Sequence, residues 1–336
     1  MPKVDISKVG IIPYVSLADA SVQDHSTGDT QFPGVYNDAL FLWAMVDTED
    51  GKRYELIREL SASAAFDYNL HECSTDLWEH PRNVRFPSES DLYAGLIMWF
   101  ERDGKQIVYP AHAQMRAKHR LRISLGPDEY VWKEDENCID VVLSPLPMNV
   151  TAIYVPGLPD DVGYTSSGCT VEGTIEGSKI IGGYGGLDRM YCLPGRSAHD
   201  SKIAELEHYW FVWGSISADG TWETGNAMLG TGNYATATFH RQGEPPIIAT
   251  NDDVDSKVVW ETQGNRSQPR YATLSFGGRT FNFEATHNAA AAGISLGIAW
   301  MHGTMHEEGA PTPVKSWSTM EVIKSRATPR DQQKAT

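Results

Sequence analysis

Apolar and polar residues alternate with a period of two in many short segments of the chain. The odd-numbered positions from Val171 to Ile175 fall on one face, whereas Thr170, Glu172 and Thr174 fall on the other. This alternation predicts a strand with one buried face and one face in water. Similar apolar runs recur along the chain at 40–46, 92–100, 106–109, 121–124, 139–143, 207–217, 233–239, 257–260, 271–276, 279–283 and 294–301.

Short turn sequences separate these runs at the spacing of β-hairpins. They lie at 49–51 (EDG), 102–104 (RDG), 218–220 (ADG) and 276–278 (FGG). Only residues 111–120 and 197–207 have a helical pattern, and both segments are short. Regularly spaced strands without alternating helices predict an all-β fold of the sandwich or barrel type.

The segment 144–168 is the part of the chain densest in Pro, Gly and Asp. Proline cannot donate a hydrogen bond to a sheet, so this composition predicts a connector. We therefore expect two strand-rich domains, at 1–155 and 156–325, followed by a flexible polar tail at 326–336.

Composition narrows the classes of function. The 336 residues include 28 Lys and Arg against 44 Asp and Glu, for a net charge of −16, together with 10 Trp, 14 Tyr and 10 Phe. The aromatic content allows a large core and excludes global disorder, and the acidic balance without a basic run argues against a nucleic-acid partner. No apolar stretch approaches the ~18 residues of a membrane span.

The N-terminus lacks the pattern of a secretory signal, so we expect a cytoplasmic location. The cysteines have no Cys-x-x-Cys spacing, and buried free thiols are expected, with two disulfides as the alternative in an exported protein. They are Cys73, Cys138, Cys169 and Cys192.

One predicted strand carries large side chains on both of its faces. Tyr209, Phe211 and Trp213 share one parity, and His208 and Trp210 share the other. Such a strand needs cover on both sides, or one face that lines an apolar cavity. The rings therefore either fill a core between packed barrels or line a ligand pocket.

Two adjoining segments resemble a known superfamily. Residues 169–191 (CTVEGTIEGSKIIGGYGGLDRMY) and 209–213 (YWFVW) are similar to the strands that open the second barrel in the tandem lipocalin-like proteins. This superfamily contains AttH-type proteins, carotenoid 1,2-hydratases, kievitone hydratases and fungal Diels–Alderases. A weaker similarity to the opening strand of the first barrel lies at 34–38 (GVYND) and 41–43 (FLW).

The resemblance implies two consecutive lipocalin-like antiparallel β-barrels packed together, with few short helices. It also implies a lipophilic ligand, such as a terpenoid, a polyketide or a prenylated phenol, held in or between the barrels. The chain matches no complete catalytic set of any one activity, so hydration, cyclisation and simple binding all stay open.

Asp188 and Arg189 form the most distinctive pair of candidate residues. A carboxyl group beside apolar rings has a raised pKa, which suits a general acid, whereas an adjacent Arg lowers that pKa. Neighbours on a strand point to opposite faces, so the two side chains need not touch. The alternative is a structural ion pair that closes the Gly-rich turn.

His208 and Trp210 share a face next to the expected pocket. A neutral imidazole can move a proton near pH 7, and an indole can stabilise a cation by its ring face. A histidine at a barrel rim is the structural alternative. His71 and Glu72, together with His80, can also supply an acid–base pair, although the sequence around them predicts an exposed turn.

Other site types lack support. The glycines between 182 and 186 do not have dinucleotide-binding spacing and are expected to allow bulges and close backbone approach. His302 and His306 would lie about 13 Å apart in a strand, so we expect no metal site there. The sequence holds no P-loop.

We expect an enzyme that needs no cofactor and that hydrates, dehydrates, isomerises or cyclises a lipophilic small molecule in an apolar pocket. Its expected catalytic residues are Asp188, Arg189 and His208. Its expected substrate-binding residues are Tyr191, Trp210, Trp213, Trp300 and Trp43. A non-catalytic carrier of a hydrophobic metabolite is the first alternative, and an all-β interaction protein whose aromatic residues are all core is the second.

Overall fold

The computed structural model describes most of the strands that the alternation predicts. The described residues are 13–18, 32–61, 65–84, 101–103, 106–110, 121–126, 128–134, 138–156, 161–195, 207–290, 298–323 and 327. Within these ranges the chain is built from strands, with a single 3-10 turn, η4 at Asn251–Asp253, and the described part holds no helix long and apolar enough to cross a membrane.

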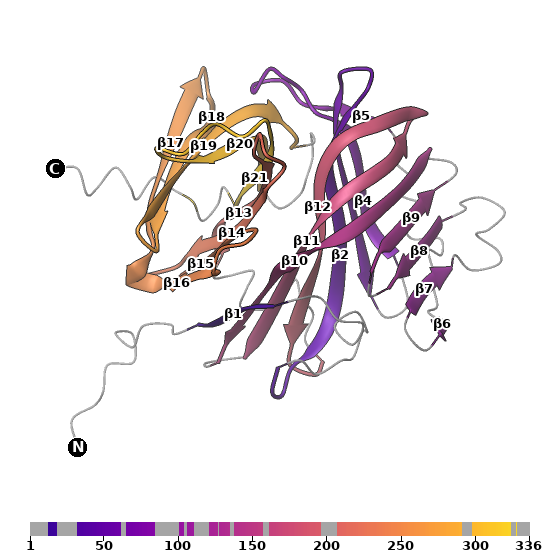
Figure 1. Ribbon diagram of the computed structural model, residues 1–336, viewed down its shortest axis with the longest axis horizontal. Coiled ribbons are helices and arrows are strands. Elements are labelled where there is room, and N and C mark those ends of the chain that lie inside the picture. The colour runs from indigo at the N-terminus through magenta and orange to yellow at the C-terminus, as the bar shows by residue number, and fades with distance from the viewer. Residues whose placement is uncertain are drawn as a thin grey trace.

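Two curled antiparallel sheets lie side by side (Figure 1). The first has the strand order β5-β4-β3-β2-β12-β11-β10-β9-β8-β7-β6, with β1 paired to β10, and the second has the order β16-β15-β14-β13-β21-β20-β19-β18-β17. The first sheet contains β1 (Tyr14–Ala18), β2 (Tyr36–Thr48), β3 (Arg53–Ser61), β4 (Ala65–Glu72), β5 (Arg82–Asn83), β6 (Glu101–Asp103), β7 (Gln106–Pro110), β8 (Leu121–Leu125), β9 (Tyr130–Glu134), β10 (Ile139–Val155), β11 (Val162–Ile175) and β12 (Ser178–Cys192). The second contains β13 (Glu207–Ile216), β14 (Trp222–Gly230), β15 (Ala235–Arg241), β16 (Ile247–Thr250), β17 (Asp255–Gln263), β18 (Arg266–Phe276), β19 (Arg279–Asn288), β20 (Ile298–Glu307) and β21 (Lys315–Ile323). The prediction of an all-β fold with two consecutive, packed antiparallel units is confirmed.

The turn signals lie where hairpins need them. Gly51 has a φ of +80° between β2 and β3, and Gly277 and Gly278 have φ values of +58° and +76° between β18 and β19. Two successive residues with positive φ form the turn whose twist matches that of paired strands, and glycine adopts this conformation without steric penalty.

Each sheet curls around a core made by one parity of its strands. In β2, the even-numbered residues from Leu40 to Val46 belong to the core inside the first sheet, and Trp132 of β9 closes the same cluster. Inside the second sheet, Phe211 and Trp213 pack with the aromatic residues of β15, β18 and β19. The inner faces of both sheets are therefore filled mainly by apolar side chains.

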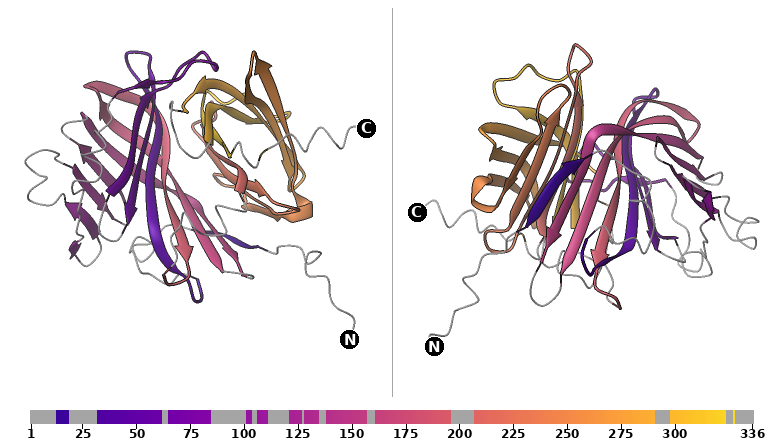
Figure 2. Two further views of the ribbon diagram at one scale, coloured as in Figure 1. Left: turned by 180° about the vertical axis from the view of Figure 1, so that it is seen from behind. Right: turned by 60° about the horizontal axis from the view of Figure 1, so that its bottom comes forward.

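The outer faces of the two sheets pack against each other. Trp43 of β2 and Tyr184 of β12 meet Val212 of β13 and Trp317 of β21 in one buried cluster. The layer continues where the hydroxyl groups of Thr151 and Thr238 lie 2.7 Å apart, between β10 and β15. Figure 2 shows β10, β11, β12 and β2 alongside the second sheet from two further directions. We call this region the inter-sheet layer.

A segment that follows β4 crosses from the first sheet to the second. Ser74 and Asn288 exchange two backbone hydrogen bonds, of 3.0 and 2.7 Å. Leu77 then enters the core of the second sheet, and its carbonyl accepts a hydrogen bond from Gln268. The first sheet thus supplies part of the second core.

The structure corrects the predicted connector. Pro145 and Pro147 lie inside β10, at a bulge where the register with β11 shifts between Pro145 and Val150. A bulge tolerates proline because the local ladder is already interrupted. The stretch 169–191, which the resemblance placed at the start of a second barrel, pairs with β2 and β10 in the first sheet.

The chain passes from the first sheet to the second between Cys192 and Glu207. The division into domains at 155/156 stays a prediction. The helical pattern at 111–120 lies outside the described residues, as does most of the one at 197–207, whose last residue begins β13.

Glycine at 225 is required by the packing of Trp213. A Cβ atom at this position would lie 2.0 Å from the indole, so we expect Gly225→Ala to lower the free energy of unfolding by about 1–3 kcal/mol. Urea unfolding measures this loss. Combining it with Trp213→Phe, which shortens the ring system, should cost less than the sum of the two single changes, and strict additivity would contradict this account.

Candidate functional site in the inter-sheet layer

The inter-sheet layer gathers most of the titratable side chains that the structure buries. Residues of one parity in β2, β3 and β12 face residues of one parity in β13, β20 and β21. Such outer faces normally meet water, where polar residues are expected. Here the second sheet covers them, and several acidic and imidazole groups are buried among tryptophans.

Asp188 of β12 lies at the centre of this layer and is 6 % exposed. Its Oδ2 accepts a hydrogen bond of 2.9 Å from the hydroxyl of Tyr164, while Oδ1 is buried without a hydrogen-bond partner among the described residues. Burial raises the pKa of Asp188 to about 6, against the opposing effects of Ser166, Trp43, Tyr164 and the charge of Arg189. A carboxyl group with this pKa exchanges protons close to neutral pH.

Two tryptophans stand next to this carboxyl group. The rings of Trp43 and Trp210 meet edge to face, with centroids 5.8 Å apart and an interplanar angle of 90°. In the described part of the structure neither buried indole N–H reaches full hydrogen-bond geometry with a partner, although the Trp43 N–H lies close enough to Asp188 to oppose the rise of its pKa. Unsatisfied donors beside an unsatisfied acceptor are typical of a site that holds a water molecule or the polar end of a ligand.

Glu321 of β21 lies on the opposite side of the layer. It is placed across from Trp210 in β13 and from Trp300 in β20, and its carboxylate accepts a hydrogen bond from the Trp300 indole. Burial raises the pKa of Glu321 to about 7. The Trp300 hydrogen bond opposes this rise, and the charges of Glu55 and Asp188 add to it. The two carboxyl groups therefore influence each other's ionisation.

A third carboxylate is held between two histidines from different sheets. Glu55 of β3 lies 3.7 Å from Nδ1 of His71 and 3.7 Å from Nε2 of His302. Burial pushes the pKa of Glu55 upward, but the two imidazoles outweigh burial and hold the pKa below its usual value. The Sγ of Cys73 lies 3.5 Å from the other ring nitrogen of His302, and burial raises the pKa of this thiol well above its ordinary value. At neutral pH, Glu55 is thus an anion beside a neutral thiol.

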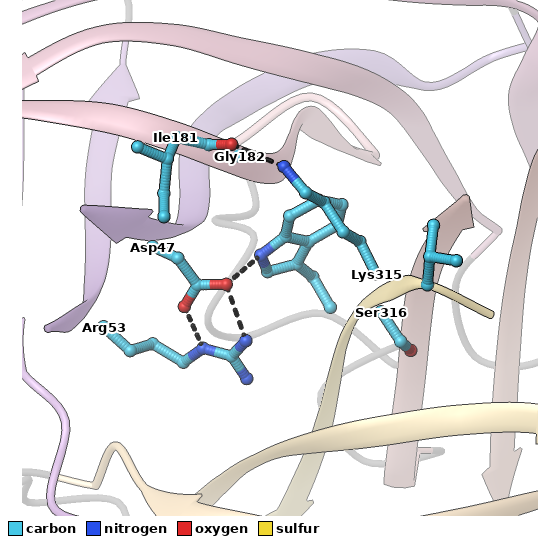
Figure 3. A pocket seen from close by; sticks show the side chains of 8 residues that line it. Asp47, Arg53, Ile181, Gly182, Lys315 and Ser316 are labelled. Carbon is cyan, nitrogen blue, oxygen red and sulfur yellow. Dashed lines mark hydrogen bonds and ion pairs between the residues drawn. The ribbon is translucent and has the colours of Figure 1, made fainter. Parts of the chain in front are cut away.

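An open cavity of about 210 Å³ lies at one end of the layer (Figure 3). Asp47 accepts hydrogen bonds from Arg53, at 2.7 and 2.9 Å, and from the Trp317 indole, at 2.9 Å. Lys315 reaches across the opening and donates to the carbonyl of Ile181 at 2.6 Å. The charges of Asp47 and Arg53 influence the pKa of Cys73, so the cavity adjoins the histidine cluster.

The structure brings together only part of the predicted site. Asp188, Trp43 and Trp210 meet in the inter-sheet layer, and Trp300 is joined to them through Glu321. The predicted acid and three of the predicted tryptophans therefore share one region.

The remaining predicted residues lie elsewhere. Arg189 and Tyr191 project to the inner face of the first sheet, away from Asp188. His208 lies at a partly exposed position, where Nε2 is 3.1 Å from the hydroxyl of Thr231. Trp213 fills the core of the second sheet. The alternative of an ion pair between Asp188 and Arg189 has no support, because no guanidinium nitrogen of Arg189 lies within 4.0 Å of a carboxylate oxygen of Asp188.

The sequence analysis missed Glu55, Glu321 and the pairing of His71 with His302. His71 was placed in an exposed turn, yet it is fully buried. The alternating pattern did contain one signal. Trp300 and His302 are two residues apart and Trp317 and Glu321 four apart, so the members of each pair lie on the same face of a strand. The strand expected around His302 and His306 is observed as β20, and in the described part of the chain no group of three or more His, Cys, Asp or Glu side chains is arranged to hold a metal ion.

Comparison with solved structures finds chains of similar arrangement, among them the following two. A provisionally named AttH protein from Nitrosomonas europaea has 13 % sequence identity and a TM-score of 0.48, and the match covers 90 % of this chain and 99 % of that one. Kievitone hydratase from Nectria haematococca has 10 % identity and a TM-score of 0.41, with coverage of 93 % and 98 %. No family model and no curated protein matches the sequence.

The raised pKa of Asp188 predicts a specific dependence of stability on pH. A carboxyl group whose pKa rises from 3.8 to about 6 on folding stabilises the native state below pH 3.8, and this contribution disappears as the pH rises through 6. At 1.36 kcal/mol per pKa unit, the change is about 3 kcal/mol.

Asp188→Asn removes this titration. Relative to the wild type, the variant should therefore gain about 3 kcal/mol of unfolding free energy between pH 4 and pH 8. Urea unfolding at several pH values measures the difference, and parallel curves for the two proteins would contradict the raised pKa.

Proposed function

We propose that the protein is an enzyme that adds protons to, and removes protons from, a lipophilic small molecule held in the inter-sheet layer. The reaction classes that fit are hydration or dehydration and isomerisation or cyclisation. The observation that carries the proposal is the buried Asp188, whose pKa is about 6 and whose Oδ1 has no hydrogen bond in the described structure, next to Trp43 and the ring of Trp210 that packs on it.

The chemistry needs a donor in its protonated form and an acceptor in its ionised form. Near pH 6–7 both Asp188 and Glu321 exchange between these forms, because burial places both pKa values in this range. In hydration, protonated Asp188 gives its proton to one alkene carbon, and a water oxygen bonds to the other carbon. The water then releases a proton to a carboxylate, and Asp188 is reprotonated, so the net change is the addition of one water.

Isomerisation uses the same groups without water. One carboxyl group protonates an alkene carbon, and a carboxylate removes a proton from a neighbouring carbon, so the double bond moves. Indole ring faces stabilise the cationic intermediate of either route by cation–π attraction. Trp43 and Trp210 supply such faces next to the carboxyl group.

The lining of the layer supports a mainly apolar substrate with few polar groups. Trp43, Met45, Tyr184 and Val212 form a continuous apolar surface in the layer. The cavity of about 210 Å³ is smaller than the ~300–1,000 Å³ of ordinary ligand pockets, so it holds part of such a molecule. Substrate identity and independence from cofactors remain part of the proposal.

In the first experiment, the purified protein is incubated with an extract of lipophilic metabolites. Mass spectrometry then identifies which compounds are consumed, formed or bound. A product that differs by one water supports hydration or dehydration, and a product of equal mass but new retention time supports isomerisation or cyclisation. A compound recovered bound and unaltered would contradict the proposal and support a carrier.

Asp188→Asn tests the assigned residue. We expect at least a tenfold loss of turnover on the substrate so identified, in line with the ~10²–10⁴-fold contribution of general acids. Asp140→Asn is a matched control, because Asp140 is an exposed carboxylate paired with Lys133 on the surface. Wild-type turnover in Asp188→Asn would exclude Asp188 as the proton donor.

Glu321→Gln tests the coupling between the two carboxyl groups. Removal of a neighbouring negative charge lowers the pKa of Asp188, so the pH dependence of turnover should shift to lower pH. A loss of turnover with an unchanged pH profile would instead indicate that Glu321 only supports the structure.

A further inference from the structure

Arg189 occupies the inner face of the first sheet, one residue from Asp188 but on the opposite side. In the register it lies between Thr165 of β11 and Leu40 of β2, and Leu40 belongs to the core that the sheet encloses. These strands run next to each other in the middle of the first sheet (Figure 1). The guanidinium therefore projects into the interior of the curl.

This buried cation has no anionic partner within salt-bridge distance among the described residues. Arg189 is 1 % exposed, and its Nε and Nη1 atoms lack hydrogen-bond partners in the described structure. The contact that the structure gives it is with the ring of Tyr191, whose centroid lies 5.9 Å from the guanidinium carbon. Burial of an unpaired charge is strongly unfavourable, so a partner is expected.

A second buried arginine on the same inner face does have an anionic partner, a carboxylate. Arg58 of β3 is also buried, and its Nη2 lies 2.6 Å from Glu134. The indole of Trp132 donates to the same carboxylate at 2.7 Å. The chain thus provides a carboxylate for Arg58, whereas its described part provides none for Arg189.

Further polar atoms near Arg189 are also unsatisfied. The hydroxyl of Thr165, directly across from Arg189, is buried without a hydrogen-bond partner, as are both amide atoms of Asn37, across from Tyr191. Phe32, Val35 and Tyr191 form apolar walls in the same region. One cation, a hydroxyl and an amide beside apolar walls match a carboxylate on an apolar body, because a multiply charged phosphate would need more than one cation.

We propose that the interior of the first sheet binds the carboxylate of an amphipathic organic acid, with Arg189 as the ionic partner and Thr165 and Asn37 as hydrogen-bonding partners. This site is distinct from the inter-sheet layer and does not depend on the activity proposed for it. The strongly acidic chain repels anions at long range, so the proposed affinity comes from these local contacts.

Laurate and dodecanol serve as probes, because they share an apolar chain and differ in the charged group. Isothermal titration calorimetry of the full-length protein should detect laurate binding, with dodecanol binding at least tenfold weaker. Arg189→Met should weaken laurate binding at least tenfold and leave dodecanol binding within twofold. Arg189→Lys keeps the charge and should bind laurate more tightly than the methionine variant does.

Arg82→Met is the matched control, since it removes an exposed arginine of the same sheet that is paired with Glu72, and it should leave laurate binding unchanged. Thermal unfolding without ligand adds a second readout, because Arg189→Met removes an uncompensated charge and should unfold no earlier than the wild type.

Failure of the wild type to bind laurate would overturn the proposal, as would equal laurate affinity in Arg189→Met. A Tm well below that of the wild type would also overturn it, because it would assign Arg189 a structural role. None of these results bears on the turnover of Asp188→Asn, so the two proposals can fail separately.

Discussion

The burial of the outer face of one sheet against the outer face of the other determines the rest of this structure. A curled sheet encloses a core on its inner face and normally leaves its outer face to water. Here the inner faces hold the apolar cores, and Trp43, Tyr184, Val212 and Trp317 join the outer faces into a third apolar cluster. Side chains that would titrate normally on an exposed sheet are thereby removed from water.

The carboxyl groups of this layer respond to their removal from water in two different ways. Glu55 stays ionised because two imidazoles from opposite sheets lie beside it. At Asp188 and Glu321, burial outweighs the groups that oppose it, and the pKa values of both carboxyl groups rise toward neutrality. The same interface therefore contains one permanently ionised carboxylate, Glu55, and two carboxyl groups that exchange protons near neutral pH, Asp188 and Glu321. Carboxyl groups of the second kind are typical of catalytic sites.

The sequence was sufficient to predict most of the strands, but it did not predict how the strands pair or how the two sheets pack together. Alternation and Gly-containing turns predicted the strands, and parity placed Trp210 and Trp213 on opposite faces of one strand, although both were expected to line a ligand pocket. Asp188 was recognised because a carboxyl group among rings has a predictable pKa. Nothing local showed that β12 pairs with β2, because that pairing depends on contacts far apart in the chain. For the same reason Glu55 could not be linked with His302, which comes from the other sheet.

The crossing segment after β4 affects how the molecule reaches its native state. The carbonyl of Leu77 and the side chain of Gln268 are separated by 191 residues, yet their contact completes the core of the second sheet. Contacts so distant in sequence form late, since the intervening chain must first lose most of its freedom. The second sheet consequently cannot finish folding as an autonomous unit, and its final consolidation is coupled to that of strands made much earlier in synthesis.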